Sequence, residues 1–463
     1  MSRRTLLRGI GAAGVVAALR PMSALAAAPA ASPVSGSPTP KPAWHNWSGL
    51  QSCQPAAWQV PANEDETLAL LRNAAAPLRC VGAGHSFTQL VPTEGSLLSM
   101  DRLSGLRAHD AVAGTATLGA GTRLAAASRA LDAVGLALRN LPDIDVQTLA
   151  GALATATHGT GAKLQALHAE AQQLTLLTPR GERIVCSRTQ RPEVFAAAQV
   201  SLGALGVLSE VTLKVRPRHV LHRRVWLMPT EELLQAVPTL AAKHHQFECY
   251  LLPHTGYGAA ITHDEVTESP RARPPAPDED VLRDLKRLRD WVGRWPSLRR
   301  WVAQKAIDPT MTEEATDWSW KLLSTQRPTR FNESECHVPR EQGVACLREV
   351  LATLEKRDDV FFPIEFRFIA GDDAWLSPFH DRDSCSIAVH AAHDEPWEYL
   401  VKDVGAVYRR HAGRPHWGKL HDRTAAELRA LYPRWDDFQQ VRRELDPTGR
   451  MLNPYLRRLF GEA

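Results

Sequence analysis

The chain has 463 residues, of which 55 are basic and 51 acidic, giving a formal net charge of +4. This near balance excludes the strongly basic composition typical of nucleic-acid-binding proteins. The hydrophobic fraction of 44% and the charged fraction of 23% are ordinary for a globular enzyme, and the length favours two domains over one core. No run reaches the roughly 20 apolar residues that a membrane-spanning helix needs, so we expect no membrane span.

The first residues are typical of an export signal. The pair Arg3-Arg4 precedes a weakly apolar segment at 9–19, and small residues follow at 24–26. This three-part pattern predicts a twin-arginine signal peptide at 1–27 and an Ala/Pro/Ser-rich leader at 28–45. We therefore expect the mature protein to be periplasmic or secreted.

A first domain is expected at residues 46–217, where short strands, glycine turns and helices alternate. Hydrophobic spacing predicts helices at 64–76 and 122–134. Period-two alternation and turn residues predict strands at 78–81, 96–100, 115–119, 173–178, 183–186 and 210–215, with 173–178 and 183–186 forming a hairpin.

A second domain is expected at residues 218–463, where longer helices alternate with strands. The pattern predicts helices at 230–243 and 278–306 and an exposed Pro-rich loop at 269–280. It also predicts strands at 249–252 and 360–368 and a compact terminal element at 442–460. The whole chain is therefore predicted to be of the α+β class.

A glycine-rich turn follows the strand predicted at 78–81. It reads Val81, Gly82, Ala83, Gly84, His85, Ser86. Glycine allows positive φ and close approach of a ligand to the backbone, and successive N–H groups in such a turn can hold phosphate oxygens. The histidine would place a nucleophilic imidazole beside the bound phosphate compound. The alternative is an ordinary surface turn.

Two further segments carry possible chemistry. Residues 151–161 are unusually small, which suits a backbone lying against a flat ligand. Glu365 and Arg367 are two apart on a predicted strand, so both side chains face the same way and can line one pocket. The alternative for this pair is a surface ion pair, which the apolar neighbours Ile364 and Phe366 disfavour.

These motifs, in this order, resemble those of the aldonolactone oxidoreductases, which have a two-domain FAD-binding fold of the vanillyl-alcohol-oxidase type with a substrate (cap) domain. The resemblance covers nearly all of residues 47–460. Its most diagnostic part is the tetrapeptide at 416–419, His-Trp-Gly-Lys, and residues 330–335 match the substrate-domain strand of the family.

The resemblance implies FAD as cofactor, attached covalently through His85, with the C-terminal segment returning to the flavin. It implies a flavin shield at Pro142, where oxidases of the wider fold more often carry glycine or proline. The remaining implied cofactor contacts are His158, Gly159, Gly161, Gly206, Val207, His416 and Lys419.

The resemblance also implies oxidation of the secondary alcohol beside the carbonyl of a sugar-1,4-lactone. Glu365 would bind sugar hydroxyls, Arg367 the carbonyl or reduced flavin, and Lys419 the reacting hydroxyl. His390 is the candidate for a further catalytic histidine, with His393 as the alternative. Electrons would pass to oxygen or another redox acceptor. An alditol (polyol) oxidase and a non-catalytic flavoprotein remain alternatives.

No metal site is expected, because none of the seven cysteines forms a Cys-x-x-Cys pair.

Overall fold

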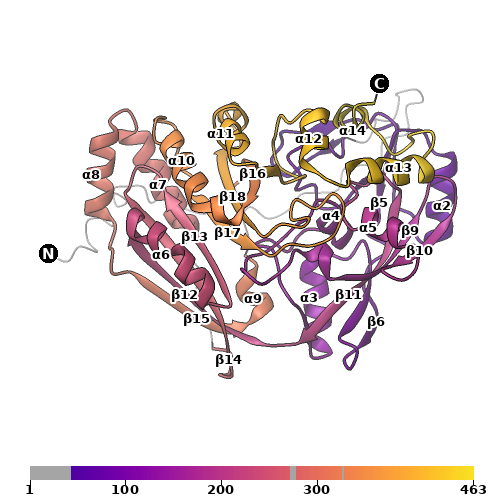
Figure 1. The fold of residues 1–463 in the computed structure, drawn as a ribbon, viewed down its shortest axis with the longest axis horizontal. Helices are drawn as coiled ribbons and strands as arrows, with labels where there is room; N and C mark the ends of the chain where they lie inside the picture. Colours follow the sequence, from indigo (N-terminus) through magenta and orange to yellow (C-terminus); the bar gives the residue numbers. More distant parts are fainter. Residues whose placement is uncertain (1–42, 272–277, 326–327, 463) are drawn as a thin grey trace, which may run out of the picture.

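The computed structural model describes residues 43–271, 278–325 and 328–462. The predicted signal peptide, nearly all of the leader and part of the predicted loop at 269–280 lie outside these ranges. Three main sheets organise the chain, and their order in sequence follows the colour gradient of Figure 1.

The first sheet is small and carries the glycine-rich turn. Its parallel strands, in the order β3-β5-β4, are β3 (Ala57–Gln59), β4 (Leu78–Val81) and β5 (Ser96–Ser99). Helix α2 (Glu64–Asn73) connects β3 to β4, and Asn63 caps its N-terminus by accepting from the N–H of Glu66. A separate short pair is formed by β1 (Trp44–His45) and β2 (Ser52–Cys53).

The second sheet has six strands, and its main path has the order β10-β9-β11-β7-β6. The strands are β6 (Leu106–Asp110), β7 (Thr115–Gly119), β8 (Leu136–Leu138), β9 (Ala171–Leu177), β10 (Arg183–Ser187) and β11 (Val207–Pro217), with β8 pairing to β11. Its helices are α3 (Leu124–Ala133), α4 (Leu149–Ala154), α5 (Pro192–Ala198) and the 3-10 turn η1 (Leu167–Glu170).

The third sheet has eight strands in the order β15-β12-β14-β13-β17-β18-β16-β19, all antiparallel. They are β12 (Val220–Pro229), β13 (Gln246–Leu252), β14 (Tyr257–Val266), β15 (Thr312–Trp318), β16 (Phe331–Pro339), β17 (Ile364–Ile369), β18 (Ser384–Ala392) and β19 (Arg414–Pro415). The accompanying helices are α6 (Thr230–Lys243), α7 (Asp278–Val292), α8 (Pro296–Ala306), α9 (Ser319–Leu323), α10 (Gly343–Leu354), α11 (Glu398–Arg410) and the 3-10 turn η2 (Arg340–Gln342).

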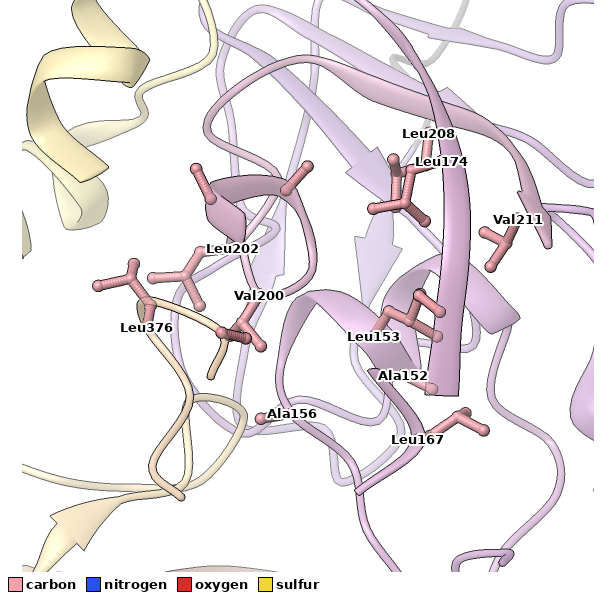
Figure 2. Packing of buried hydrophobic residues seen from close by; sticks show 14 of the residues in the cluster. Ala152, Leu153, Ala156, Leu167, Leu174, Val200, Leu202, Leu208, Val211 and Leu376 are labelled. Carbon is pink, nitrogen blue, oxygen red and sulfur yellow. The ribbon is translucent and has the colours of Figure 1, made fainter. Parts of the chain in front are cut away.

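The end of the chain packs back on the part that contains the second sheet. Helices α12 (Ala425–Leu431), α13 (Trp435–Leu445) and α14 (Pro454–Phe460) lie at the same end of the molecule as α2, α4 and α5 in Figure 1, and α13 contacts α5. Their apolar side chains share one core with residues of β7, β9 and β11. Figure 2 shows the same mixing, because Leu376 lies against Val200 and Leu202. The second sheet ends at Pro217 and the third begins at Val220. The largest hydrophobic core nevertheless contains residues from both sides of this boundary. The predicted domain boundaries therefore stay a prediction.

Most predicted elements are found within a few residues of their expected bounds, and two are wrong in a way that has a clear cause. The helix predicted at 278–306 is two helices, because Gly293 and Pro296 interrupt it. The strand predicted at 360–368 begins at Ile364 instead, directly after Pro363, which cannot donate to a sheet. No helix of the described residues is long and apolar enough to cross a membrane.

Candidate active site

A large cavity lies where the glycine-rich turn, the second sheet and the third sheet meet. Its empty space, counted together with the adjoining space that is open to solvent, is about 1350 Å³. Its walls come from the turn after β4, from α4, from residues 201–208 and from residues 416–419. Ten of the predicted cofactor contacts line it, namely Val81, Gly82, Ala83, Gly84, His85, Ser86, Gly206, Val207, His416 and Lys419.

The backbone of the glycine-rich turn fits a phosphate group. Gly84 has φ +69°, a conformation that favours glycine, and the turn faces the cavity. Within the part of the chain that the structure describes, the N–H groups of Ala83, Gly84, His85 and Ser86 donate no hydrogen bond. Four adjacent unpaired donors in such a turn match the oxygens of a pyrophosphate. This end of the cavity therefore fits a dinucleotide such as FAD.

His85 is held at the edge of the cavity with its ring stacked on Trp47, at a centroid distance of 4.9 Å. Burial, and then the positive charges of Lys419 and Arg123, lower the pKa of His85 to about 4. The imidazole is therefore neutral at physiological pH. A neutral imidazole is the form that can act as a nucleophile.

Lys419 comes close to the same turn from the other end of the chain. Phe87 N–H donates to the Gly418 carbonyl at 2.7 Å, and the Lys419 ammonium lies 5.2 Å from the centre of the Phe87 ring. Lys419 forms an ion pair with Glu333 and lies 3.8 Å from a carboxylate oxygen of Glu335. Burial alone would lower its pKa, but these two negative charges outweigh that effect and raise it. Lys419 is therefore a permanent cation at the His85 end of the cavity.

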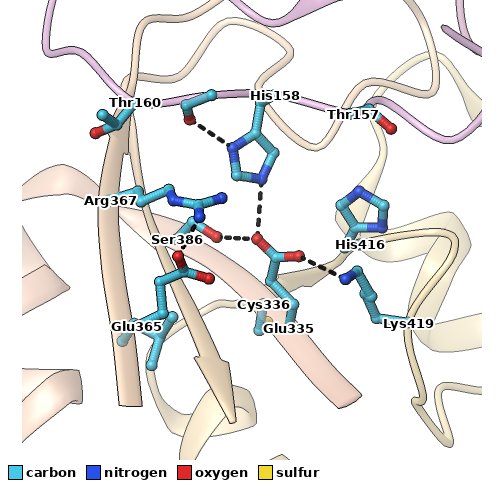
Figure 3. Close-up of polar contacts among 12 residues, drawn as sticks. Thr157, His158, Thr160, Glu335, Cys336, Glu365, Arg367, Ser386, His416 and Lys419 are labelled. Carbon is cyan, nitrogen blue, oxygen red and sulfur yellow. Dashed lines mark hydrogen bonds and ion pairs between the residues drawn. The ribbon is translucent and has the colours of Figure 1, made fainter. Parts of the chain in front are cut away.

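Glu335 connects Lys419 to a buried histidine. His158 Nε2 lies 2.9 Å from Glu335, and its Nδ1 lies 2.9 Å from the Gly159 carbonyl (Figure 3). Since a carbonyl only accepts, the contact with Gly159 is a hydrogen bond in the tautomer that carries its proton on Nδ1. Burial would raise the pKa of Glu335, but His158 and Lys419 hold it well below its usual range. Ser386 also donates to this carboxylate.

A second histidine, His337, completes this buried group. One ligand-type atom of each of His158, Glu335 and His337 lies within 4.8 Å of the others. Both ring nitrogens of His337 are without a hydrogen-bond partner among the described residues. Glu335, however, already pairs with a histidine, a hydroxyl and a lysine, so its charge is balanced by the protein itself.

Arg367 is surrounded by three carboxylates. It forms ion pairs with Asp143, Glu365 and Glu248, the last at 3.0 Å. Burial would lower its pKa, but the three charges raise it well above the usual value. Tyr250 in turn donates to Glu365. Glu365 and Arg367 thus share one buried face as expected, but neither is among the residues that line the cavity.

The remaining predicted residues divide into two groups. His390 Nε2 lies 3.7 Å from Glu333, the carboxylate that pairs with Lys419. His393, in contrast, is 41% exposed and pairs with Asp394.

Pro142, His158, Gly159 and Gly161 do not line the cavity. Pro142 is buried beside the small-residue segment, where a Cβ on Gly159 would lie 2.2 Å from the carbonyl oxygen of Leu141.

Four acidic residues of the site were missed by the sequence reasoning. Glu333 and Glu335 alternate along β16, so both face Lys419, and this spacing within the matched segment 330–335 was a usable signal. Asp143 and Glu248 gave no such signal. Glu248 reaches Arg367 only because β13 and β17 pair in a register that places these two residues opposite each other.

Comparison with known proteins agrees with this geometry. Residues 211–459 match the D-arabinono-1,4-lactone oxidase family, and residues 55–187 match an FAD binding domain. L-gulono-1,4-lactone dehydrogenase of Mycobacterium tuberculosis is 36% identical over 428 residues, covering 91% of this chain and 99% of that protein. L-gulonolactone oxidase of Bos taurus is 30% identical, covering 90% and 98%.

The fold is also found among solved structures. A solvent-stable cholesterol oxidase has a TM-score of 0.74 at 18% identity, covering 91% of this chain and 97% of that one. At this identity the likeness concerns the fold alone. The match to the lactone oxidase family spans more than half of the chain. The separate match to an FAD binding domain includes the turn whose unpaired donors fit a pyrophosphate. The chain therefore belongs to the D-arabinono-1,4-lactone oxidase family and is an FAD-dependent oxidoreductase.

Proposed function

We propose that the protein oxidises the secondary alcohol next to the carbonyl of a sugar-1,4-lactone, of the gulono-, galactono- or arabinono-lactone type. The observation that carries the proposal is the Lys419–Glu333 ion pair at the His85 end of the cavity. A cation and an anion side by side can bind both the oxygen and the proton of one hydroxyl. The names of the relatives support a sugar lactone as the substrate.

The residues present would hold FAD along the cavity. The free N–H groups at 83–86 would bind its pyrophosphate, and residues 201–208 would line the other end. Bound FAD supplies an acceptor for the carbon-bound hydrogen and its electron pair. A covalent bond from the neutral imidazole of His85 would fix the cofactor beside Lys419.

Different side chains would stabilise the reacting oxygen and accept its proton. The Lys419 ammonium would donate to the reacting oxygen and stabilise negative charge as it develops there, a preorganised electrostatic effect. The hydroxyl proton would leave to water or to a nearby carboxylate, and Glu333 is the carboxylate bonded to Lys419. His390 lies next to Glu333 and would orient it.

The surroundings of Arg367 favour a different role from the one that the resemblance implies, which was to hold the carbonyl or the reduced flavin. Its guanidinium is shared among three carboxylates, so it acts as a positioning residue that fixes Glu365. Glu365 would then bind the more distant sugar hydroxyls together with Tyr250. Arg367 thus supports substrate binding through Glu365.

A substrate panel under anaerobic conditions tests the proposed activity. L-gulono-, L-galactono- and D-arabinono-1,4-lactone are mixed separately with the protein while the flavin absorbance is followed. At least one lactone should bleach the flavin within the mixing experiment. Bleaching by open-chain alditols alone would assign a polyol oxidase, and no bleaching by any sugar would favour a non-catalytic flavoprotein.

Two further aspects of the function are proposed from the sequence. Oxygen or another redox acceptor takes the electrons. The resemblance assigns control of oxygen access to Pro142, although this residue does not line the cavity. The Arg3-Arg4 pair directs export of the folded protein to the periplasm or beyond. Changing both arginines to lysine should leave the uncleaved protein inside the cell, as a cell-fractionation blot would show.

A further inference from the structure

The helical pair α7–α8 carries an unusual group of exposed aromatic side chains. Trp291 is 73% exposed, Trp295 59% and Trp301 58%, and Leu298 between them is 43% exposed. Trp291 lies in the last turn of α7, Trp295 directly before α8, and Leu298 and Trp301 three residues apart on one face of α8. Large apolar side chains gathered at the surface mark an interaction site.

The orientation of α8 is the reverse of what its composition favours. Arg299 is fully buried and donates to the Val360 carbonyl at 2.7 Å, whereas Trp301 points to solvent. Helix α7 is fixed as well, because Arg289 donates to both carboxylate oxygens of Glu395, at 2.7 and 2.8 Å. Both helices are therefore anchored in a position that leaves the tryptophans exposed.

Basic side chains surround these tryptophans. On α7, α8 and the turn between them, the charged side chains described as exposed are Arg283, Lys286, Arg287, Arg294, Arg300 and Lys305 against Asp280, Asp284 and Asp290. Four of these cations each pair with an acidic side chain, namely Arg283, Lys286, Arg287 and Arg300. Only Arg294 and Lys305 of this set form no ion pair with another described residue, and they leave the surface with an excess of positive charge. The surface is thus positive as well as aromatic, and its complement is an anionic partner.

We propose that this surface, formed by Trp291, Trp295, Leu298, Trp301 and the basic side chains around them, attaches the protein peripherally to an anionic phospholipid bilayer. Tryptophan combines a large apolar ring with an N–H group and is enriched at the level of lipid headgroups. Lysine and arginine add attraction to anionic lipids.

The position of the pair in the molecule suits this attachment. Helices α7 and α8 lie at one outer end, on the far side of the third sheet from α12–α14 (Figure 1). The cavity residues come from the turn after β4, from α4 and from 416–419, so contact through α7–α8 does not involve them. The proposal does not depend on the identity of the substrate.

Vesicle flotation tests the proposal. The full protein is mixed with vesicles of phosphatidylcholine alone or with phosphatidylglycerol, and the co-floating fraction is measured at low and high salt. We expect binding to the anionic vesicles that weakens with salt. The triple variant Trp291→Ser, Trp295→Ser, Trp301→Ser should lose it, and Trp58→Ser, an exposed tryptophan of the first sheet, should not.

A charge variant separates the two contributions. Arg294→Gln with Lys305→Gln should weaken binding to anionic vesicles roughly 30-fold, since each cation near such a surface contributes about a fivefold factor. All variants share the same N-terminus, so any contribution of residues 1–42 cancels. Their flavin absorbance and turnover in solution should match the parent, which shows that they fold.

Three outcomes would overturn the proposal. The first is no binding of the parent protein to anionic vesicles, and the second is unchanged binding of the tryptophan variant. The third is a parent protein that is a dimer by light scattering and becomes a monomer when the three tryptophans are replaced, which would assign the surface to self-association.

Discussion

Lys419 and Arg367 are both largely buried cations held by carboxylates, yet their surroundings differ. Lys419 pairs with Glu333, lies near Glu335 and borders the cavity. Arg367 is enclosed by Asp143, Glu248 and Glu365 and is absent from the cavity wall. The first retains donors that can reach a substrate, whereas the second has its donors directed to its own carboxylates. The role of each cation therefore depends on the residues that surround it.

Replacing Lys419 should have the largest effect on chemistry. Lys419→Met removes the one preorganised donor at the reacting oxygen, so flavin reduction by lactone should slow by about 10²- to 10³-fold. Stopped-flow absorbance under anaerobic conditions measures this rate. Lys286→Ala, whose lysine forms an exposed ion pair with Asp290, is the control and should reduce its flavin at the parent rate. A Lys419→Met variant that keeps the parent rate would remove Lys419 from the mechanism.

Replacing Arg367 should act mainly on stability. Arg367→Ala leaves three carboxylates together without their cation, which should lower the free energy of unfolding by about 3–5 kcal/mol. Urea denaturation measures the change. Adding Glu248→Gln should recover part of the loss, because burial and the charge of Asp143 already raise the pKa of Glu248.

The exposed pair Arg188–Asp373 offers a matched control for that variant. Arg188→Ala should cost less than about 1 kcal/mol, because water and salt screen such a pair. An Arg367→Ala protein as stable as the parent, with flavin reduction slowed as much as in Lys419→Met, would show that Arg367 acts directly on the reaction.

The pH dependence of cofactor attachment is a third, smaller test. Because the pKa of His85 is lowered to about 4, its imidazole stays almost wholly neutral at pH 5.5, and attachment of FAD to the apoprotein should proceed as at pH 7.5. A histidine with the ordinary pKa near 6.5 would be only about one tenth neutral at pH 5.5, giving a roughly tenfold slower reaction.

Acid-precipitated protein retains covalently bound flavin, so the colour of the pellet at successive times measures the attachment. His85→Ala should give a colourless pellet. In Lys419→Met the rate should fall more at pH 5.5 than in the parent, because one of the charges that lower the His85 pKa is gone. A colourless pellet from the parent protein would exclude covalent attachment.

The smallest effect is expected at Pro142, which lies next to one of the carboxylates that pair with Arg367. Its carbonyl accepts from Ser324 Oγ at 2.7 Å, and the next residue, Asp143, pairs with Arg367. If Pro142 leaves a path for oxygen, Pro142→Ala should slow reoxidation of the reduced flavin by air without changing its reduction. Mixing reduced enzyme with aerated buffer measures this, and Pro192→Ala at the start of α5 is a distant control. Equal reoxidation rates would make Pro142 a structural residue only.

The strand and turn around His85 could be predicted from the sequence because their signals are local. Pro77 and Gly82 bracket an apolar run, and β4 occupies residues 78–81 as expected. Helix α6 likewise has its predicted bounds of 230–243. The single helix expected at 278–306 failed because its hydrophobic spacing continues across the break at Gly293.

The electrostatics of the site could be predicted only in part. Lys419 and Arg367 were both identified, but their different roles depend on partners far away in sequence. Asp143 and Glu248 reach Arg367 through a loop and through the pairing of β13 with β17. Strand register follows from the packing of whole sheets, and no short motif encodes it.

Arg79 has a consequence for how the protein is made. This buried guanidinium, one residue into β4, donates to the carbonyls of Leu90, Leu202 and Gly203 and to that of Met451 at 2.7 Å. Arg79 thus connects three residues of the cavity wall, Leu90, Leu202 and Gly203, to a residue 372 positions later in the chain. In a nascent chain the last of these hydrogen bonds cannot form until residue 451 has been made. We expect stable retention of the cofactor to need the nearly complete chain, so ribosome-stalled fragments that end before residue 451 should retain less FAD than the full chain.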